Sequence, residues 1–203
     1  MTSGRAIRGL AWLVAFATLA GCIGATTPSG APPDDSAPGS WAVLAPMPSA
    51  RQELAVAEAG GKVYAIGGFG DSYEPVGTVE AYDPAANRWE TRTPLPIPVH
   101  HPAAVSLNGK IYVLGGFTGR VSQTAQDILF EYDPATNAWR QLASMPTPRG
   151  ALAAAELQGK IHALGGAQDR ALNSHEVYDP TTDRKSTRLN SSHIQKSRMP
   201  SSA

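Results

Sequence analysis

The feature that most limits the fold of this chain is an internal repeat. An apolar segment that ends in paired glycines occurs three times, as GKVYAIGGF at 61–69, GKIYVLGGF at 109–117 and GKIHALGGA at 159–167. A second segment also occurs three times, as YDPAANRW at 82–89, YDPATNAW at 132–139 and YDPTTDRK at 178–185. The period is about 46 to 50 residues, so one structural unit is built three times in succession.

The first copy shows how each unit is organised. Four short strands are expected, at 53–59, at 62–66, at 78–82 and in a last segment that Trp89 opens. Glycine pairs and Asn-Gly or Gln-Gly steps favour a tight turn between the first two strands, and Asp-Pro followed by Asn favours another between the last two. The paired glycines end the second strand, where a side chain would obstruct the close approach of a neighbouring unit.

These motifs together resemble the kelch repeat over residues 41–182. The resemblance implies an all-β fold, a kelch-type β-propeller in which each repeat supplies one four-stranded blade. We expect the propeller to be incomplete, with about three blades of an expected six. Two blades should be full, the third should have three strands, and WAVLAPMP at 41–48 should form a strand without partners.

The N-terminal 21 residues have the layout of a secretory signal peptide. Arg5 and Arg8 precede an apolar run over 10–20, which is too short to span a membrane. The small residues before Cys22 resemble the lipobox of bacterial lipoproteins, which implies that Cys22 is acylated and becomes the mature N-terminus. The alternative is an ordinary signal peptide followed by a cysteine with no such role.

The segment after this cysteine is dominated by Pro, Gly, Ser, Ala and Asp, so residues 22–40 are expected to form a flexible, lipid-anchored linker. A two-chain lipid on Cys22 would hold the protein firmly on a membrane. The predicted location is the bacterial cell envelope: the outer membrane where the cell has one, and otherwise the outer face of the plasma membrane.

The third copy breaks at Lys185, where the spacing of the first two copies requires a Trp. Residues 183–203 contain no glycine and no strand-like alternation. Asp183–His193 can be reverse-translated into a common sequencing-library adapter, and the frame continues to match up to Ala203. We therefore interpret 183–203 as a non-native tail read through into an incomplete gene, whose own frame should continue into more repeats. The alternative is a basic, disordered tail or one that binds an acidic partner.

Charge limits the possible partners. Residues 22–182 contain 10 Lys and Arg residues against 16 Asp and Glu residues, so this part of the chain is acidic. Nucleic acid is excluded as a predicted partner, because phosphate binding needs a basic surface. The expected partners are the membrane, through the N-terminal lipid, and a protein or carbohydrate ligand.

The spacing between motifs indicates which face could bind that ligand. Only the distance from the paired glycines to the following Tyr varies between copies, so the loop between the second and third strands differs most. In a four-stranded meander this loop emerges on the same face as the connection between blades, and binding residues concentrate on loops held by a rigid scaffold. The candidate ligand-binding residues on this face are Arg51, Asp71, Tyr73, His100, His101, Arg120, Arg149, Asp169 and Arg170.

Arginine and histidine near a propeller axis suit a carboxylate or an acidic sugar, because they form charge-assisted hydrogen bonds. The alternative for Arg51 and Arg149 is that they bind backbone carbonyls of their own repeat. No metal site is predicted at His100 and His101, because adjacent residues of a strand point to opposite faces. No catalytic residue and no cofactor are predicted.

Three classes of function remain open. One is a lipid-anchored binding module for a protein or a glycan. Another is a structural envelope protein without a ligand. The remaining one is an enzyme, because the resemblance extends to kelch propellers that are copper oxidases or a sialic acid mutarotase. The oxidase reading needs a cysteine crosslinked to a tyrosine, and the sole Cys22 is assigned to the lipid.

Overall fold

The computed structural model describes residues 39–120, 123–181 and 184–188. The chain divides into two compact units, 1–41 and 42–203, and the fold below is that of the second unit. The predicted signal peptide, Cys22 and most of the linker lie outside the described residues. No helix in the described ranges has the length and apolar character needed to cross a membrane.

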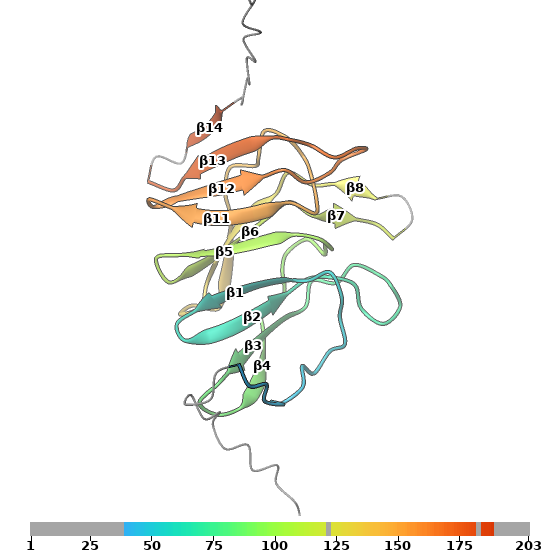
Figure 1. Cartoon of the computed structure of the whole chain (residues 1–203), viewed down its shortest axis with the longest axis vertical. Coiled ribbons are helices and arrows are strands. Elements are labelled where there is room, and N and C mark those ends of the chain that lie inside the picture. Colours follow the sequence, from blue (N-terminus) through green and yellow to red (C-terminus); the bar gives the residue numbers. More distant parts are fainter. Residues whose placement is uncertain (1–38, 121–122, 182–183, 189–203) are drawn as a thin grey trace, which may run out of the picture. The chain divides into compact units, whose positions relative to one another are not determined.

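The described strands form three four-stranded antiparallel sheets, which we call blades 1, 2 and 3 (Figure 1). Blade 1 contains β1 (Ala55–Ala59), β2 (Lys62–Ile66), β3 (Val79–Asp83) and β4 (Arg88–Arg92). Blade 2 contains β5 (Ala103–Leu107), β6 (Lys110–Leu114), β9 (Leu129–Asp133) and β10 (Ala138–Gln141). Blade 3 contains β11 (Ala153–Leu157), β12 (Lys160–Leu164), β13 (His175–Asp179) and β14 (Arg184–Arg188). The short hairpin of β7 (Phe117–Thr118) and β8 (Thr124–Ala125) lies in the loop between β6 and β9.

Each blade is a meander, so successive strands are neighbours. The tight turns after the first strands and after β3 lie on the left in Figure 1, and the longer loops after the second strands lie on the right. The predicted all-β blade architecture is therefore confirmed, and the long loops share one face. We call it the loop face.

Two predictions about individual strands were wrong. Blade 3 has a fourth strand, β14, where three strands were expected. Lys185 pairs with Tyr178 in the register in which Trp89 pairs with Tyr82, because ladder hydrogen bonds use backbone groups and do not require the missing Trp. Residues 41–48 form no strand. Instead, Asn87 and Trp89 of blade 1 hold this segment through the backbone of Ala45.

Trp and Asn side chains at the end of one blade hold the chain that leaves the previous blade. The Trp139 indole N–H donates to the Thr93 carbonyl at 2.9 Å, and the Thr93 N–H donates to Asn137 Oδ1 at 3.0 Å. The Tyr132 ring packs against Trp139, with ring centroids 4.8 Å apart, and its hydroxyl donates to the same Asn137 oxygen. The equivalent groups of blade 1 hold Ala45 in the same way. The repeated Tyr, Asn and Trp therefore link blades as well as filling space.

The paired glycines permit a close backbone approach between blades, as predicted. A Cβ on Gly67 would lie 2.8 Å from the Val99 carbonyl oxygen, and one on Gly115 would lie 2.3 Å from that of Arg149. A real Cβ atom does not approach a backbone oxygen this closely. These two positions therefore require glycine.

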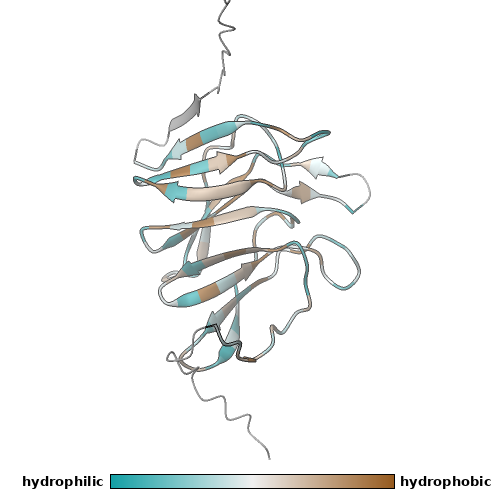
Figure 2. Ribbon diagram, viewed as in Figure 1, coloured by the Kyte–Doolittle hydropathy of each residue, from teal (hydrophilic) through white to brown (hydrophobic). Residues whose placement is uncertain are grey.

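Apolar strand residues form two cores, one between blades 1 and 2 and one between blades 2 and 3. Figure 2 shows hydrophobic positions within the strands and hydrophilic ones towards the turns. The first core includes Ile66, Val79, Ile111 and Val113, none of which is exposed. Blade-to-blade packing, which a single four-stranded sheet lacks, therefore supplies the buried surface.

A buried ion pair fixes the start of blades 1 and 3 but not of blade 2. Arg51 binds Glu80 at 2.8 Å, and Arg149 binds Glu176 at the same distance. The equivalent positions of blade 2 are the apolar, buried residues Val99 and Phe130, which belong to the first core. One sheet architecture thus tolerates either a charged or an apolar pair at this place.

This natural alternation predicts how blade 1 should respond to substitution. Arg51→Met should lower the free energy of unfolding by about 3–5 kcal/mol, because it leaves the Glu80 carboxylate buried without its cation. The double variant Arg51→Val/Glu80→Phe copies blade 2 and should recover most of that loss. Urea denaturation at pH 7 measures both values, with the exposed Arg88→Ala expected to stay within about 0.5 kcal/mol of wild type. A double variant no more stable than Arg51→Met would contradict the interpretation.

Glu131 on β9 is the centre of a second polar network, in blade 2. It accepts hydrogen bonds from Lys110 at 2.9 Å, from the Tyr112 hydroxyl at 2.8 Å and from Arg140 at 3.1 Å. Burial alone would raise the pKa of Glu131, but these three donors outweigh it and lower the pKa below its usual 4.5. Burial, followed by the hydrogen bond to Glu131, raises the pKa of Tyr112.

The lowered pKa of Glu131 implies a pH-dependent contribution to stability. A carboxyl whose pKa is lower in the folded state stabilises the fold above its unfolded pKa, and the contribution is lost as pH falls through the folded value. Glu131→Gln should therefore destabilise the protein more at pH 7 than at a pH of about 3.5. Urea denaturation of both proteins at each pH measures the difference. An equal loss at both pH values would show that ionisation of Glu131 does not contribute.

Candidate functional site

Three equivalent residues with left-handed backbones line up on the loop face. Glu53, His101 and Ala151 each lie two residues before the first strand of a blade and have φ values of 56°, 52° and 52°. The His101 N–H donates to the Glu53 carbonyl, and the Ala151 N–H donates to the His101 carbonyl, both at 2.9 Å. Because non-glycine residues adopt this conformation rarely, the hydrogen-bonded series marks a place where the fold imposes it. We call it the inner ladder.

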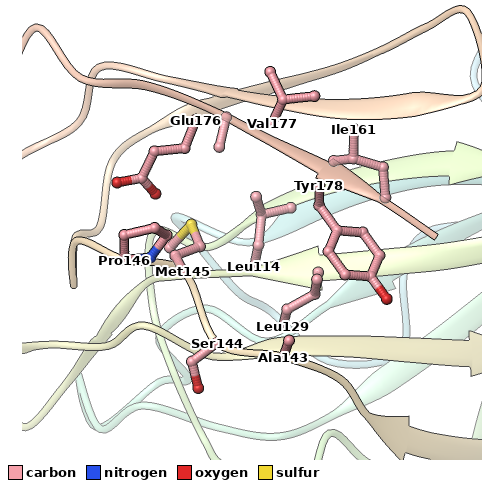
Figure 3. A pocket seen from close by; sticks show the side chains of 11 residues that line it. Leu114, Leu129, Ala143, Ser144, Met145, Pro146, Ile161, Glu176, Val177 and Tyr178 are labelled. Carbon is pink, nitrogen blue, oxygen red and sulfur yellow. The ribbon is translucent and has the colours of Figure 1, made fainter. Parts of the chain in front are cut away.

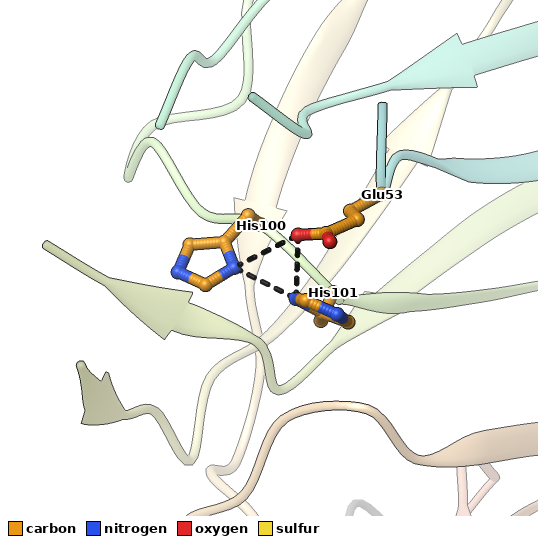
Figure 4. Close-up of side chains that lie close together, drawn as sticks. All are labelled: Glu53, His100 and His101. Carbon is orange, nitrogen blue, oxygen red and sulfur yellow. Dashed lines mark hydrogen bonds and ion pairs between the residues drawn. The ribbon is translucent and has the colours of Figure 1, made fainter. Parts of the chain in front are cut away.

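The inner ladder brings His100, His101 and Glu53 together, as Figure 4 shows. The Nδ1 atoms of the two histidines lie 2.7 Å apart, and Glu53 Oε2 lies 3.0 Å from His101 Nδ1 and 3.7 Å from His100 Nδ1. The expectation that the two rings diverge was wrong. It assumed an extended strand, whereas His101 has a positive φ and β5 begins only at Ala103.

His100 is fully buried between aromatic rings. Its imidazole stacks on Phe69 with centroids 3.9 Å apart and planes inclined by 23°, and the Phe117 ring lies 5.5 Å away. Its Nε2 lies 3.2 Å from the Gly119 carbonyl oxygen. Burial, followed by the neighbouring His101, lowers the pKa of His100, although the Gly119 carbonyl and Glu53 oppose the shift. The ring is therefore held in its neutral form at neutral pH.

A groove of about 410 Å³ opens beside this cluster on the loop face. Its lining residues come from the inner ladder and from the loops of blades 1 and 2, and they are Glu53, Phe69, Tyr73, His101, Arg120 and Gln123. The Tyr73 ring is 56% exposed and the Arg120 side chain is exposed to the same extent. The predicted residues Tyr73, His101 and Arg120 therefore do meet in one place.

The loop of blade 1 sets the position of Tyr73. Tyr73 has a φ of 58°, and its N–H donates to the Gly70 carbonyl at 2.9 Å. Its ring lies 6.5 Å from that of Phe69, which is buried below it. A second cavity of about 270 Å³ shares Phe69 and Tyr73 with the groove and is also lined by Asp71. Asp71 thus lies next to the groove without lining it.

Arg51 and Arg149 serve the architecture of their blades, which is the alternative that the sequence left open. The Arg51 guanidinium donates to the carbonyls of Gly67 and Thr78, both at 2.9 Å, in addition to binding Glu80. Arg149 donates to the Thr147 carbonyl and to Glu176. Their side chains are 1% and 0% exposed, so neither guanidinium is presented to a ligand.

Two further predicted residues lie apart from the groove. Asp169 and Arg170 are exposed on the loop between β12 and β13 of blade 3, and neither lines the groove. Conversely, the sequence prediction omitted Glu53, Phe69 and Gln123. Aligning the repeats could have found Glu53, because it follows Arg51 by two residues as His101 follows Val99.

A third cavity, between blades 2 and 3, is too small to hold a ligand (Figure 3). Its volume is about 20 Å³, and apolar side chains such as Leu114, Leu129 and Ile161 dominate its lining. A cavity of this size has room for about one water molecule, and a water needs two or more polar partners. Ser144, Glu176 and Tyr178 also line it, so the cavity suits a single water molecule at most and not a larger ligand.

Comparison with known proteins agrees with this architecture. A solved structure titled "Structure of YjhT" matches with a TM-score of 0.61 and 19% sequence identity, over 72% of this chain and 53% of that chain. The chain thus spans about half the length of that protein, and at this identity the likeness concerns the fold. The family model described as the KLHDC2/KLHL20/DRC7 Kelch-repeats domain matches residues 39–203, and the chain therefore belongs to this kelch-repeat family.

Proposed function

We propose that this kelch propeller is a binding module that holds a protein or glycan segment in the groove on its loop face. The observation that carries the proposal is the composition of the groove: an exposed aromatic ring, an exposed guanidinium and a carboxylate come together from two blades. Its volume of about 410 Å³ lies within the range of about 300–1,000 Å³ that is usual for ligand sites.

The groove favours a ligand that has both a flat apolar face and a negative charge. The Tyr73 ring can pack against a sugar ring or a peptide side chain, and its hydroxyl can take part in a hydrogen bond. Among the described residues, Arg120 makes a long ion-pair contact with Glu74 at 3.9 Å, and its exposed guanidinium can donate to a carboxylate. An acidic sugar or an acidic peptide segment meets both requirements.

One observation supports an enzyme as the second candidate. Glu53 and His101 are 3.0 Å apart at the edge of the groove, and a carboxylate beside an imidazole is suited to proton transfer. A carbohydrate-active enzyme, such as a sialic acid mutarotase-like kelch protein, would use them on a sugar lying against Tyr73. A structural envelope protein without a ligand is the remaining alternative.

Two substitutions in the groove test the binding proposal. The purified chain should be applied to a glycan array that includes sialylated and uronic-acid glycans, and to a displayed library of acidic peptides. Tyr73→Asn removes the ring but keeps a residue that tolerates positive φ, and Arg120→Ala removes the cation. Each should weaken binding of the selected ligand about tenfold or more, as is typical of residues that anchor an interface.

Arg88→Ala is the matched control, because Arg88 begins β4 at the opposite end of the blade from the groove. It should bind as wild type does. Equal binding by all variants would place the ligand elsewhere, and the absence of any selected ligand would favour a structural role. Faster exchange between the two anomers of N-acetylneuraminic acid, followed by NMR, would favour the enzyme.

We also propose that the module is lipid-anchored to the cell envelope through Cys22. The support is the signal layout of residues 1–21, with Ala20 and Gly21 before the cysteine, and the Pro- and Ser-rich linker that follows. Such a tether would hold the groove away from the membrane surface, where a ligand outside the cell could reach it.

The anchor proposal is tested by expression in a bacterial host. Cys22→Ser should move the protein from the membrane fraction to a soluble fraction, because no lipid can then be attached. Ser36→Ala in the linker is the control and should remain with the membranes. Immunoblotting of the fractions measures the distribution. Recovery of Cys22→Ser with the membranes at the wild-type level would count against acylation.

A further inference from the structure

We propose that Glu53, His100 and His101 form a binding site for a divalent transition metal ion, for which Zn²⁺ is the best fit. This site lies beside the groove but does not depend on its proposed ligand. Three arguments support it: the positions of the ligand atoms, the hydrogen bond behind His100, and the small number of hydrogens within the cluster (Figure 4).

The ligand atoms have the spacing that a metal ion requires. His100 Nδ1, His101 Nδ1 and Glu53 Oε2 form a triangle with sides of 2.7, 3.0 and 3.7 Å. A point about 2.0–2.1 Å from all three atoms lies just off the plane of this triangle, and zinc binds nitrogen and oxygen ligands at about these distances. Tetrahedral coordination would widen the shortest side to about 3.3 Å, a movement open to the partly exposed His101.

The hydrogen bond behind His100 presents the correct nitrogen to a metal. His100 Nε2 lies 3.2 Å from the Gly119 carbonyl oxygen, which can only accept a hydrogen bond. The proton of a neutral His100 is therefore on Nε2, and Nδ1 faces the cluster with a free lone pair. A histidine that binds a metal commonly donates its other N–H to a carbonyl or carboxylate in this way.

The cluster also contains fewer hydrogens than its geometry calls for. Glu53 Oε2 and His100 Nδ1 are both acceptors, and His101 Nδ1 can carry at most one hydrogen for the two of them. One hydrogen cannot satisfy both short contacts of His101 Nδ1, at 2.7 and 3.0 Å. A cation at the centre would satisfy all three atoms, with the His101 proton moved to its outward-facing Nε2.

The donor set indicates which metals would bind. Two imidazoles and one carboxylate suit zinc, and also copper, nickel or iron, whereas calcium and magnesium prefer oxygen ligands. The buried ring of His100, packed between Phe69 and Phe117, gives the ion a fixed and partly apolar wall. The exposed fractions of His101 and Glu53, 34% and 36%, leave the opposite side open to the groove. A fourth ligand could therefore be water or a group of a bound molecule.

A second histidine pair in the molecule provides a matched control. His162 on β12 and His175 on β13 have ring nitrogens 2.9 Å apart, almost as close as those of His100 and His101. Within the described ranges, Glu53, His100 and His101 form a group of three possible metal ligands. His162 and His175 belong to no such group of three. Proximity of two imidazoles is thus common to both places, and the carboxylate distinguishes them.

Metal binding can be measured directly on the purified, metal-free chain. Isothermal titration with ZnCl₂ should show saturable binding of one ion, and titration with CoCl₂ should produce visible absorption bands of a low-symmetry site. His101→Asn and Glu53→Gln should each weaken zinc binding by about 10- to 100-fold or more, at least as much as loss of an outer-shell partner does. Gln keeps the size and shape of Glu, and Asn, although smaller than His, tolerates positive φ.

The control variant is His162→Asn, which should bind zinc as wild type does. Thermal melts without metal establish that each variant is folded, and added zinc should raise the melting temperature of wild type and His162→Asn but not that of His101→Asn or Glu53→Gln. The proposal is overturned if wild type shows no saturable binding, if His101→Asn and Glu53→Gln bind zinc as wild type does, or if His162→Asn weakens binding to the same extent. Tyr73→Asn should leave zinc binding unchanged, which separates this site from the proposed ligand groove.

Discussion

The architecture depends on one contact between backbones, made where the paired glycines of a blade meet the start of the next blade. The Gly68 N–H donates to the Val99 carbonyl at 2.9 Å, and the Gly116 N–H donates to the Arg149 carbonyl at 3.0 Å. These bonds require glycine, because a Cβ on the preceding residue of each pair would overlap the same carbonyl. They fix the angle of each blade relative to its neighbour, and they place the residues that follow Val99 beside the groove, with His101 lining it and His100 buried behind it.

The sequence is a reliable guide wherever a local rule decides the structure. Repeat spacing located the blades, and turn chemistry located the hairpins at Gly60 and Asp83. It was a poorer guide where backbone pairing alone decides. Residues 184–188 continue blade 3 although Lys185 replaces the expected Trp, because strand pairing uses groups that every residue has. The interpretation of 183–203 as a non-native tail stays a prediction.

The site illustrates a different limit. Tyr73, His101 and Arg120 could be assigned to the loop face because the meander puts their loops there. The convergence of His100 with His101 could not, because the argument from strand alternation fails at a residue with positive φ. Glu53 was missed for a related reason: it reaches the histidines through the inner ladder, a contact between residues 48 positions apart that no local pattern encodes.

Blade 2 differs from its neighbours in two places at once. It lacks the buried Arg–Glu pair, which Val99 and Phe130 replace, and it alone has the two adjacent histidines. The two histidines join the cluster on the loop face, as Glu53 of blade 1 does although blade 1 keeps its Arg–Glu pair. The chemistry of the loop face is therefore independent of the pair that starts each blade.

The inner ladder also restricts which side chains can occupy that face. A left-handed backbone is costly for β-branched residues, whose second Cβ substituent crowds the main chain. Valine, isoleucine and threonine are therefore disfavoured at positions 53, 101 and 151, whatever a ligand would prefer. Each described blade thus presents to the loop face one residue from a restricted set of types. A ligand bound there would be recognised through the combination of these residues.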